Sequence, residues 1–231
     1  MTPPPDDLWI FAYGSLMWHP GFPVADMRPA RLEGYHRAFC VYSIHYRGTR
    51  QRPGLVLGLA RGSGCNGVAI RVPPESRRDV LAYLRERELI YGVYRETRLR
   101  ARLASDSHPA CEIDVLTYVA DMRHPSFAGD MSITTQARII RTARGRSGSN
   151  LAYLAATQAR LTALGIRQPE LDRLAALTGV TMLSRTDDSL HMAHAALADA
   201  RGRAQHGRPS PAPSIPFANR HAFAFRCRIG G

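Results

Sequence analysis

The chain has 231 residues, of which 45% are hydrophobic and 22% charged, a composition typical of a globular protein with one substantial core. No apolar run is long enough to cross a bilayer, and the first seven residues lack the features of a signal peptide, so we expect a cytoplasmic protein with no membrane partner. The formal net charge is +12, all 31 basic residues are arginine, and six of them lie in 201–231, a segment without Asp or Glu. The remaining excess of positive charge is spread thinly along the rest of the chain. This distribution is compatible with attraction of small anions as well as of nucleic acid.

The cysteines and histidines give no metal-binding pattern. The four cysteines lie far apart in the chain, at Cys40, Cys65, Cys111 and Cys227. We expect reduced, mostly buried thiols, with neither structural disulfides nor a zinc site. His191 and His194 are three residues apart in a predicted helix, but no third ligand accompanies them, so we expect no metal there.

The first half of the chain has mainly the pattern of strands. Strands are expected at 8–13, 31–43, 55–60, 68–73, 93–103 and 112–120. The glycine-rich segment 62–67 predicts a turn, so that 55–73 would form a hairpin. Within 93–103, Arg98, Arg100 and Arg102 alternate with less polar residues, which predicts one face on the core and one in water.

Helical periodicity follows these strands. Ser76 is a candidate N-cap for a helix that runs to about Glu88, and further helices are expected at 133–144, 150–164, 169–177 and 189–204. Residues 205–231 are rich in Pro and Arg and are predicted to form a disordered tail. The order of the elements predicts one α+β domain over 8–204, with a curled or closed sheet and flanking helices.

The first strand ends in a break at Gly14 and Ser15. A glycine there can take backbone angles closed to other residues and lets a ligand approach the chain closely. Successive N–H groups at such a break can hold an anion. The alternative is a strand followed by an ordinary turn, which is what an isolated Tyr-Gly-Ser sequence usually indicates.

Glu88 is a carboxylate on the apolar face of the helix predicted after Ser76. It follows Leu84 by four residues and Leu81 by seven, so it shares their stripe, whereas Glu86 falls on the solvated side. A carboxylate on a buried face must be paired or must rise in pKa, which is how a general base near neutrality arises. The alternative is that Glu88 lies past the helix end and pairs with an arginine in solvent.

Three motifs together resemble the ChaC family of glutathione-specific γ-glutamylcyclotransferases. They are Ile10-Phe11-Ala12-Tyr13-Gly14-Ser15-Leu16-Met17-Trp18, Tyr46-Arg47-Gly48 with Pro53-Gly54, and Tyr83-Leu84-Arg85-Glu86-Arg87-Glu88. The resemblance runs from about Leu8 to Leu164 and departs from many family members at Ala12, where a glycine is common, and after Glu88. It implies a small barrel-like α+β fold, a γ-glutamyl site in the loop from Ile10 to Ser15, and Glu88 as the catalytic acid and base.

The implied reaction is a ring closure within glutathione, in which the glutamyl amine attacks the γ-amide carbonyl to give 5-oxoproline and Cys-Gly. It needs no enzyme nucleophile, metal or cofactor, because substrate folding supplies much of the acceleration. Backbone N–H groups from Tyr13 to Leu16 would hold the substrate carboxylate or the developing oxyanion. Arg47 either binds a substrate carboxylate or is a solvated loop charge, and Tyr13 either packs or contributes its hydroxyl.

Two other functions fit part of the sequence. A related cyclotransferase would close the same ring on other γ-glutamyl amines or peptides. A nucleic-acid-binding module would explain the net charge, but no nucleic-acid motif is present and half of the excess lies in the last 31 residues, so we expect no nucleic-acid partner. We expect a monomer or dimer that acts on a small molecule.

Overall fold

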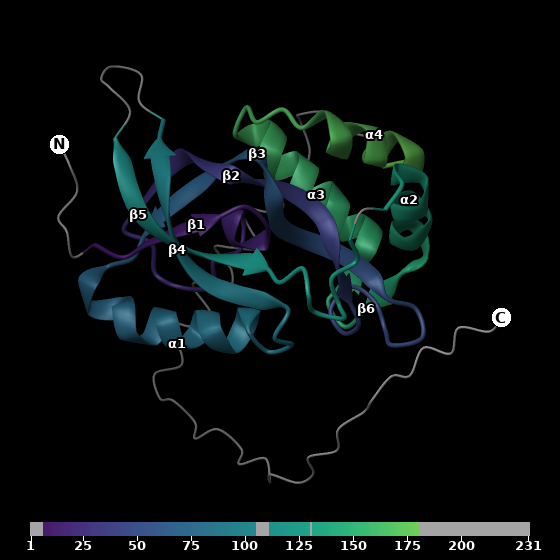
Figure 1. The fold of residues 1–231 in the computed structure, drawn as a ribbon, viewed down its shortest axis with the longest axis horizontal. Helices are drawn as coiled ribbons and strands as arrows, with labels where there is room; N and C mark the ends of the chain where they lie inside the picture. Colours follow the sequence, from purple (N-terminus) through teal and green to yellow (C-terminus); the bar gives the residue numbers. More distant parts are fainter. Residues whose placement is uncertain (1–6, 105–110, 130, 181–231) are drawn as a thin grey trace, which may run out of the picture. The chain divides into compact units, whose positions relative to one another are not determined.

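The computed structural model describes residues 7–104, 111–129 and 131–180 (Figure 1). The strands are β1 (Trp9–Ala12), β2 (Asp26–Ser43), β3 (Gly54–Arg71), β4 (Tyr94–Leu103), β5 (Glu112–Ala120), β6 (Arg144–Gly145) and β7 (Gly148–Ser149). The α-helices are α1 (Arg77–Glu88), α2 (Ile133–Thr142), α3 (Asn150–Ala163) and α4 (Pro169–Thr178), with short 3₁₀ turns at Ser15–Met17 and Pro74–Ser76. The helix predicted at 189–204 and the tail predicted at 205–231 lie outside the described residues.

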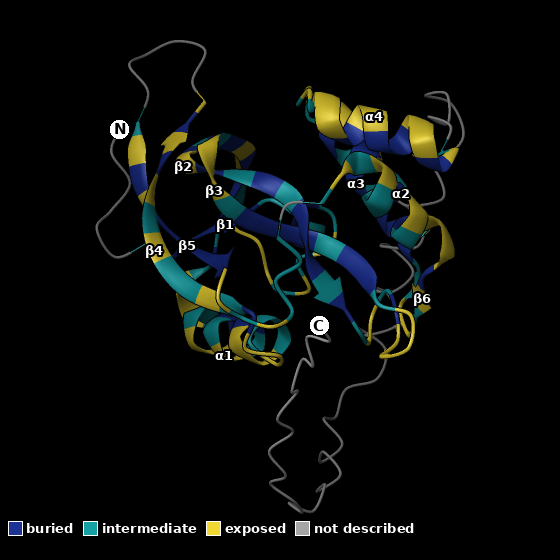
Figure 2. Cartoon of the chain, turned by 45° about the vertical axis from the view of Figure 1, so that its right-hand side comes forward, coloured by how far each residue is buried: buried dark blue, intermediate teal, exposed yellow. Residues whose placement is uncertain are grey.

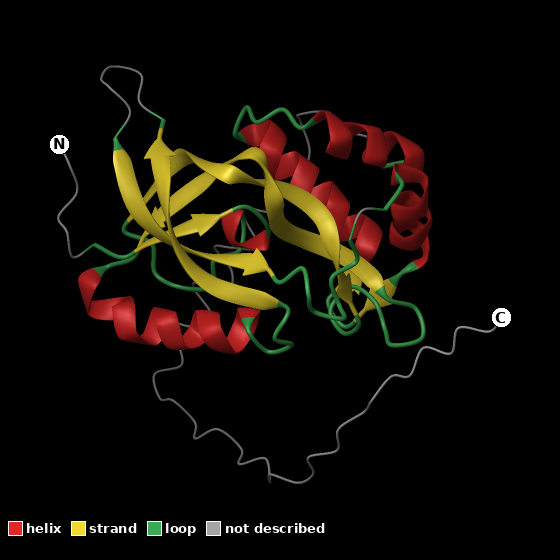
Figure 3. Cartoon of the chain, in the orientation of Figure 1, coloured by secondary structure: helices red, strands yellow, loops and turns green. Residues whose placement is uncertain are grey.

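Five strands close into a barrel in the order β1-β3-β2-β4-β5 (Figure 3). Neighbouring strands are antiparallel except β1 and β5, which pair in parallel where Ile10 faces Leu116 and so close the barrel. The α+β fold with a closed sheet, predicted from strands that precede helices, is confirmed.

The predicted turn at 62–67 is wrong, because β3 continues through it as one strand. β3 pairs with the equally long β2 from Asp26 opposite Arg71 to Ser43 opposite Gly54. The glycines serve this pairing: a Cβ on Gly62 would lie 2.3 Å from Nδ1 of His36, which crosses over it from β2. Glycine in this strand therefore marks the close approach of a neighbouring side chain rather than a reversal of the chain.

The helices lie on two sides of the sheet (Figures 1 and 2). Helix α1 lies alongside the barrel, while α2, α3 and α4 contact one another and α2 and α3 contact the long β3 strand. The outward face of β4 carries the exposed Arg98, Arg100 and Arg102, as the alternation predicts. Among the described residues, no helix combines the length and apolarity needed to cross a membrane.

Helix α1 has nearly the predicted bounds but begins differently. Ser76 makes no side-chain capping bond, because it is the last residue of the 3₁₀ turn Pro74–Ser76 and is itself in a helical conformation (φ −95°, ψ −4°). Val80 and Leu84 of α1 are buried against the barrel, as the apolar stripe predicts. The last residue of the helix, Glu88, follows on the same face.

Candidate active site

A cavity of about 740 Å³ lies where the end of β1, the end of α1, the β2–β3 loop and α3 meet. Its walls include both features singled out in the sequence, the Gly14–Ser15 break and Glu88. Segments far apart in the chain thus come together around one chamber, large enough for a small ligand.

Glu88 faces this cavity from the last turn of α1. Its side chain is 19% exposed, and Oε1 lies 3.1 Å from Nε of Arg87. Burial raises the pKa of Glu88 above its usual value, and the charge of Arg87 offsets part of this rise. The ion pair considered as an alternative therefore exists, but it lies at the cavity wall and leaves Glu88 with the raised pKa of a desolvated acid.

Arg87 joins the end of α1 to the chain that follows β1. Its Nη2 donates to Oγ of Ser15 at 2.9 Å, and its Nη1 donates to the carbonyl oxygens of His19 at 3.1 Å and Pro20 at 3.2 Å. Nη1 also donates to the hydroxyl of Tyr83 at 2.8 Å, one helical turn earlier. Arg87 therefore fixes the distance between Glu88 and the Ser15 turn, a role that was missed although Arg87 stands in one of the quoted motifs.

The Tyr-Gly-Ser segment turns into a short 3₁₀ turn in which the Met17 N–H donates to the Gly14 carbonyl at 2.9 Å. Gly14 has φ −129° and ψ −138°, a combination outside the main extended and helical regions that residues with a side chain adopt, as the sequence predicts. A Cβ there would make an ordinary van der Waals contact, 3.4 Å from the hydroxyl of Tyr153 in the cavity wall, so the packing itself does not require glycine.

The predicted γ-glutamyl loop divides between cavity and core. Phe11, Tyr13, Gly14, Ser15 and Leu16 line the cavity. The side chains of Ile10 and Ala12 instead lie in the hydrophobic core and are completely buried. Neither residue lines the cavity.

Four buried or partly buried tyrosines from different parts of the chain lie around Glu88. They are Tyr13 after β1, Tyr94 on β4, Tyr118 on β5 and Tyr153 on α3. Burial raises the pKa of each of them, that of Tyr153 to about 12, and the negative charge of Glu88 adds to each rise. All four hydroxyls therefore stay protonated near neutrality, which leaves Glu88 as the most acidic of these five groups.

The tyrosine hydroxyls are held by hydrogen bonds. Tyr13 donates to the carbonyl of Tyr118 at 2.8 Å, and Tyr94 donates to the carbonyl of Leu57 at 2.7 Å. The hydroxyl of Tyr118 donates to Glu96 at 3.2 Å. For Tyr13, this bond agrees with the packing role considered in the sequence analysis.

Arg47 contributes a cation to the opposite wall. Its Nη1 donates to the carbonyl oxygens of Ser147 at 2.5 Å and Ser149 at 3.3 Å, and its guanidinium lies 5.3 Å from the ring centroid of Tyr153. The side chain is half-buried, and this burial lowers the pKa of Arg47 from its usual value. Arg47 is therefore anchored in the wall of the cavity and is not a freely solvated loop charge.

Glycines allow the two loops around Arg47 to touch. A Cβ on Gly48 would lie 2.1 Å from the backbone nitrogen of Gly54, and a Cβ on Gly145 would lie 2.5 Å from the carbonyl oxygen of His45. The loops are joined where the Ser147 N–H donates to the Tyr46 carbonyl at 2.9 Å. The Tyr46-Arg47-Gly48 motif and the loop that precedes α3 thus form one structural unit that presents Arg47.

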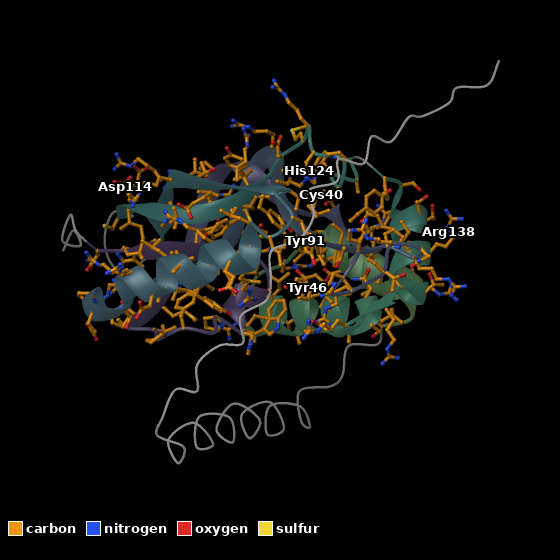
Figure 4. The ribbon with its side chains drawn as sticks, turned by 90° about the horizontal axis from the view of Figure 1, so that it is seen from below. Cys40, Tyr46, Tyr91, Asp114, His124 and Arg138 are labelled. Atoms are coloured by element: carbon orange, nitrogen blue, oxygen red, sulfur yellow. The ribbon has the colours of Figure 1, made fainter. Side chains whose placement is uncertain are left out.

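Aromatic rings lie at the outer part of the cavity. Tyr46 from the β2–β3 loop and Tyr91 from the segment after α1 are more than one-third exposed, and their ring centroids are 6.3 Å apart. Figure 4 shows these two side chains close together. His45 contacts both rings, at 5.2 Å and 6.4 Å. This cluster bridges the two loops beside the cavity.

Comparisons with known proteins agree with this architecture. A family model described as "ChaC-like protein" matches residues 8–181. The chain belongs to the ChaC family. A glutathione-specific gamma-glutamylcyclotransferase of Escherichia coli K12 is 35% identical over 172 residues, which cover 74% of this ChaC chain and 73% of the relative.

Further relatives support the assignment to the ChaC family. The human protein named glutathione-specific gamma-glutamylcyclotransferase 1 is 38% identical over 152 residues, which cover 65% of this chain and 68% of the relative. The crystal structure of a yeast gamma-glutamyl cyclotransferase specific to glutathione superposes with a TM-score of 0.68 at 22% identity, over 77% of this chain and all of that one. This structural likeness confirms the fold of the ChaC chain.

The raised pKa of Glu88 predicts a pH-dependent stability for this ChaC protein. Between the ordinary pKa of 4.5 and the raised value, the folded state binds more protons than the unfolded state, so the free energy of unfolding falls as pH rises through that window. Glu88→Gln removes this titration and is therefore expected to raise the melting temperature at pH 7. The gain should disappear below pH 4.5, where both side chains are neutral. Thermal melts of both proteins across this range measure it, and an equal or lower melting temperature of the variant at pH 7 contradicts the assignment.

Proposed function

We propose that this ChaC protein cleaves glutathione to 5-oxoproline and Cys-Gly, with Glu88 as the acid and base. The observation that carries the proposal is a desolvated carboxylate that shares one cavity with the Gly14–Ser15 turn. The names of the Escherichia coli and human relatives support glutathione as the substrate.

Glu88 would act twice in this reaction. It first accepts a proton from the glutamyl ammonium group, so that the free amine attacks the γ-amide carbonyl. It then delivers a proton to the nitrogen that leaves with Cys-Gly. A pKa raised toward neutrality suits both steps, because the same group must take up and release a proton at working pH.

The remaining polar groups of the cavity would bind and fold the substrate. Backbone N–H groups from Tyr13 to Leu16 face the charge that develops on the carbonyl oxygen or bind the glutamyl carboxylate. Arg47, on another wall, provides a cation for a substrate carboxylate. A substrate held at both ends in a bent shape has its amine next to its own amide, which makes the attack intramolecular.

The Cys-Gly half of the substrate would lie toward the aromatic cluster of His45, Tyr46 and Tyr91. Tyr46 and Tyr91 are more than one-third exposed, whereas the tyrosines around Glu88 are buried or partly buried. The Cys-Gly product would thus lie nearest to solvent.

Product analysis tests this function. Purified protein incubated with glutathione is expected to release equal amounts of 5-oxoproline and Cys-Gly, which mass spectrometry measures against a blank with Glu88→Gln. Parallel incubations with γ-glutamylalanine and γ-glutamylcysteine separate the related cyclotransferases. The absence of 5-oxoproline from glutathione, with its release from γ-glutamylalanine, would overturn the substrate but leave the ring closure in place.

The cytoplasmic location, the monomer or dimer, and the absence of a nucleic-acid partner stay predictions from the sequence. The boundary of the domain at residue 204 also stays a prediction, since the described residues end at residue 180.

A further inference from the structure

Arg37 is a buried cation that the reaction described above does not use. It lies on β2, is 2% exposed, and does not line the cavity. Its Nε donates to the Tyr13 carbonyl at 2.5 Å, Nη1 to Oε1 of Gln168 at 2.6 Å, and Nη2 to the Asn66 carbonyl at 2.6 Å. In the part of the chain that the structure describes, no carboxylate pairs with it.

Burial of the Arg37 guanidinium makes the free energy of folding less favourable. Burying a charge without an opposite charge disfavours folding, and carbonyl oxygens satisfy the N–H groups without cancelling the charge. Burial lowers the pKa of Arg37, yet an arginine stays protonated at neutral pH. A positive charge therefore stands directly behind the Tyr13–Gly14 peptide.

The bond from Arg37 fixes the orientation of that peptide. The described residues contain no cis peptide bond, so the N–H of Gly14 points opposite to the carbonyl of Tyr13. That carbonyl is turned toward Arg37, outside the cavity lining, whereas Gly14 lines the cavity. Among the described residues the Gly14 N–H has no acceptor, so it remains available to a ligand.

We infer that Arg37 is a positioning residue that aims the Gly14 N–H at the γ-carbonyl oxygen of the substrate and stabilises the negative charge that develops there. The inference rests on the proposed function for the identity of that oxygen. A donor held in place before the reaction needs no reorganisation when charge develops. The bond from a guanidinium also polarises the peptide and makes its N–H a stronger donor.

Steady-state kinetics with glutathione test this role in Arg37→Met and Arg37→Lys. Arg37→Met removes the charge and all donors, so kcat is expected to fall by at least ~10-fold with KM within about threefold, as a milder form of removing an oxyanion donor, which costs about 10²–10³-fold. Arg37→Lys keeps the charge with a single donor group and should give an intermediate kcat. If Arg37→Met does not fold, Arg37→Lys decides, and a wild-type kcat in that variant overturns the inference.

Gln168→Leu is the matched control for a purely structural role. It breaks the bond from Nη1 of Arg37 and the bond from Nε2 of Gln168 to the Arg37 carbonyl, but it leaves the contact with Tyr13. It should lower the melting temperature while kcat stays within about threefold of wild type. A loss of kcat in Gln168→Leu equal to that in Arg37→Lys means that Arg37 acts only through stability.

One measurement does not depend on activity. In the ligand-free protein, the ¹⁵N chemical shift of Gly14 is expected to change in Arg37→Lys and to stay in Gln168→Leu, because only the first alters the bond to the Tyr13 carbonyl. An unchanged shift in Arg37→Lys overturns the orientation. If the wild type releases no 5-oxoproline but the shift changes, the proposed function fails and the positioning of Gly14 stands.

Discussion

Glu88→Gln is expected to lower kcat with glutathione by about 10²–10⁴-fold, the usual contribution of general acid and base catalysis. Glutamine keeps the shape of the side chain and its place beside Arg87, but it can neither accept the ammonium proton nor deliver one to the leaving nitrogen. KM should change little, because the groups proposed to bind the substrate stay in place. Initial rates of 5-oxoproline release across pH 6 to 8.5 measure this effect.

Asp79→Asn is the control for this substitution. Asp79 is an exposed carboxylate in the first turn of the same helix, α1, whereas Glu88 is the last residue of that helix. Its loss removes one negative charge from α1, as Glu88→Gln does, and should leave kcat within twofold. A Glu88→Gln variant that retains more than a tenth of wild-type kcat contradicts the role of Glu88 as the proton carrier.

The sequence predicted the parts of the site that depend on short-range patterns. Glu88 was found because it follows Leu84 by four residues and Leu81 by seven, which places it on their apolar stripe, and α1 has this geometry. The break after β1 was found because Gly-Ser follows a run of strand-forming residues. In both cases the residues that carry the signal lie within a few positions of one another in the sequence.

The parts that were missed depend on contacts between distant segments. Arg37 meets Gln168 across 131 positions of sequence, and Tyr13 meets Tyr118 across 105. No local pattern distinguishes Arg37 from the other arginines on strands, since its contact with Tyr13 forms only when the barrel brings the end of β1 against β2. The error at 62–67 has the same origin: the preference of glycine for turns was overridden by pairing with β2.

Asn150→Ala is expected to lower the free energy of unfolding by about 2–6 kcal/mol, since it leaves two buried backbone groups without partners at about 1–3 kcal/mol each. Asn150 is completely buried at the start of α3. Its Oδ1 accepts from the Leu55 N–H at 2.6 Å, and its Nδ2 donates to the Leu55 carbonyl at 2.7 Å. The side chain thus replaces a neighbouring strand at the start of β3, where β1 does not reach.

Urea unfolding followed by circular dichroism measures this loss, with Asn66→Ala as the control. The side chain of Asn66 is exposed and makes one bond of 3.3 Å with Arg31, so its removal should change the free energy of unfolding by less than about 0.5 kcal/mol. Asn150 also holds the helix that carries Tyr153 against the strand that carries Leu57, two residues of the cavity wall. A fully stable Asn150→Ala protein would mean that water or a shifted loop satisfies Leu55, and that the cavity does not depend on this contact for its shape.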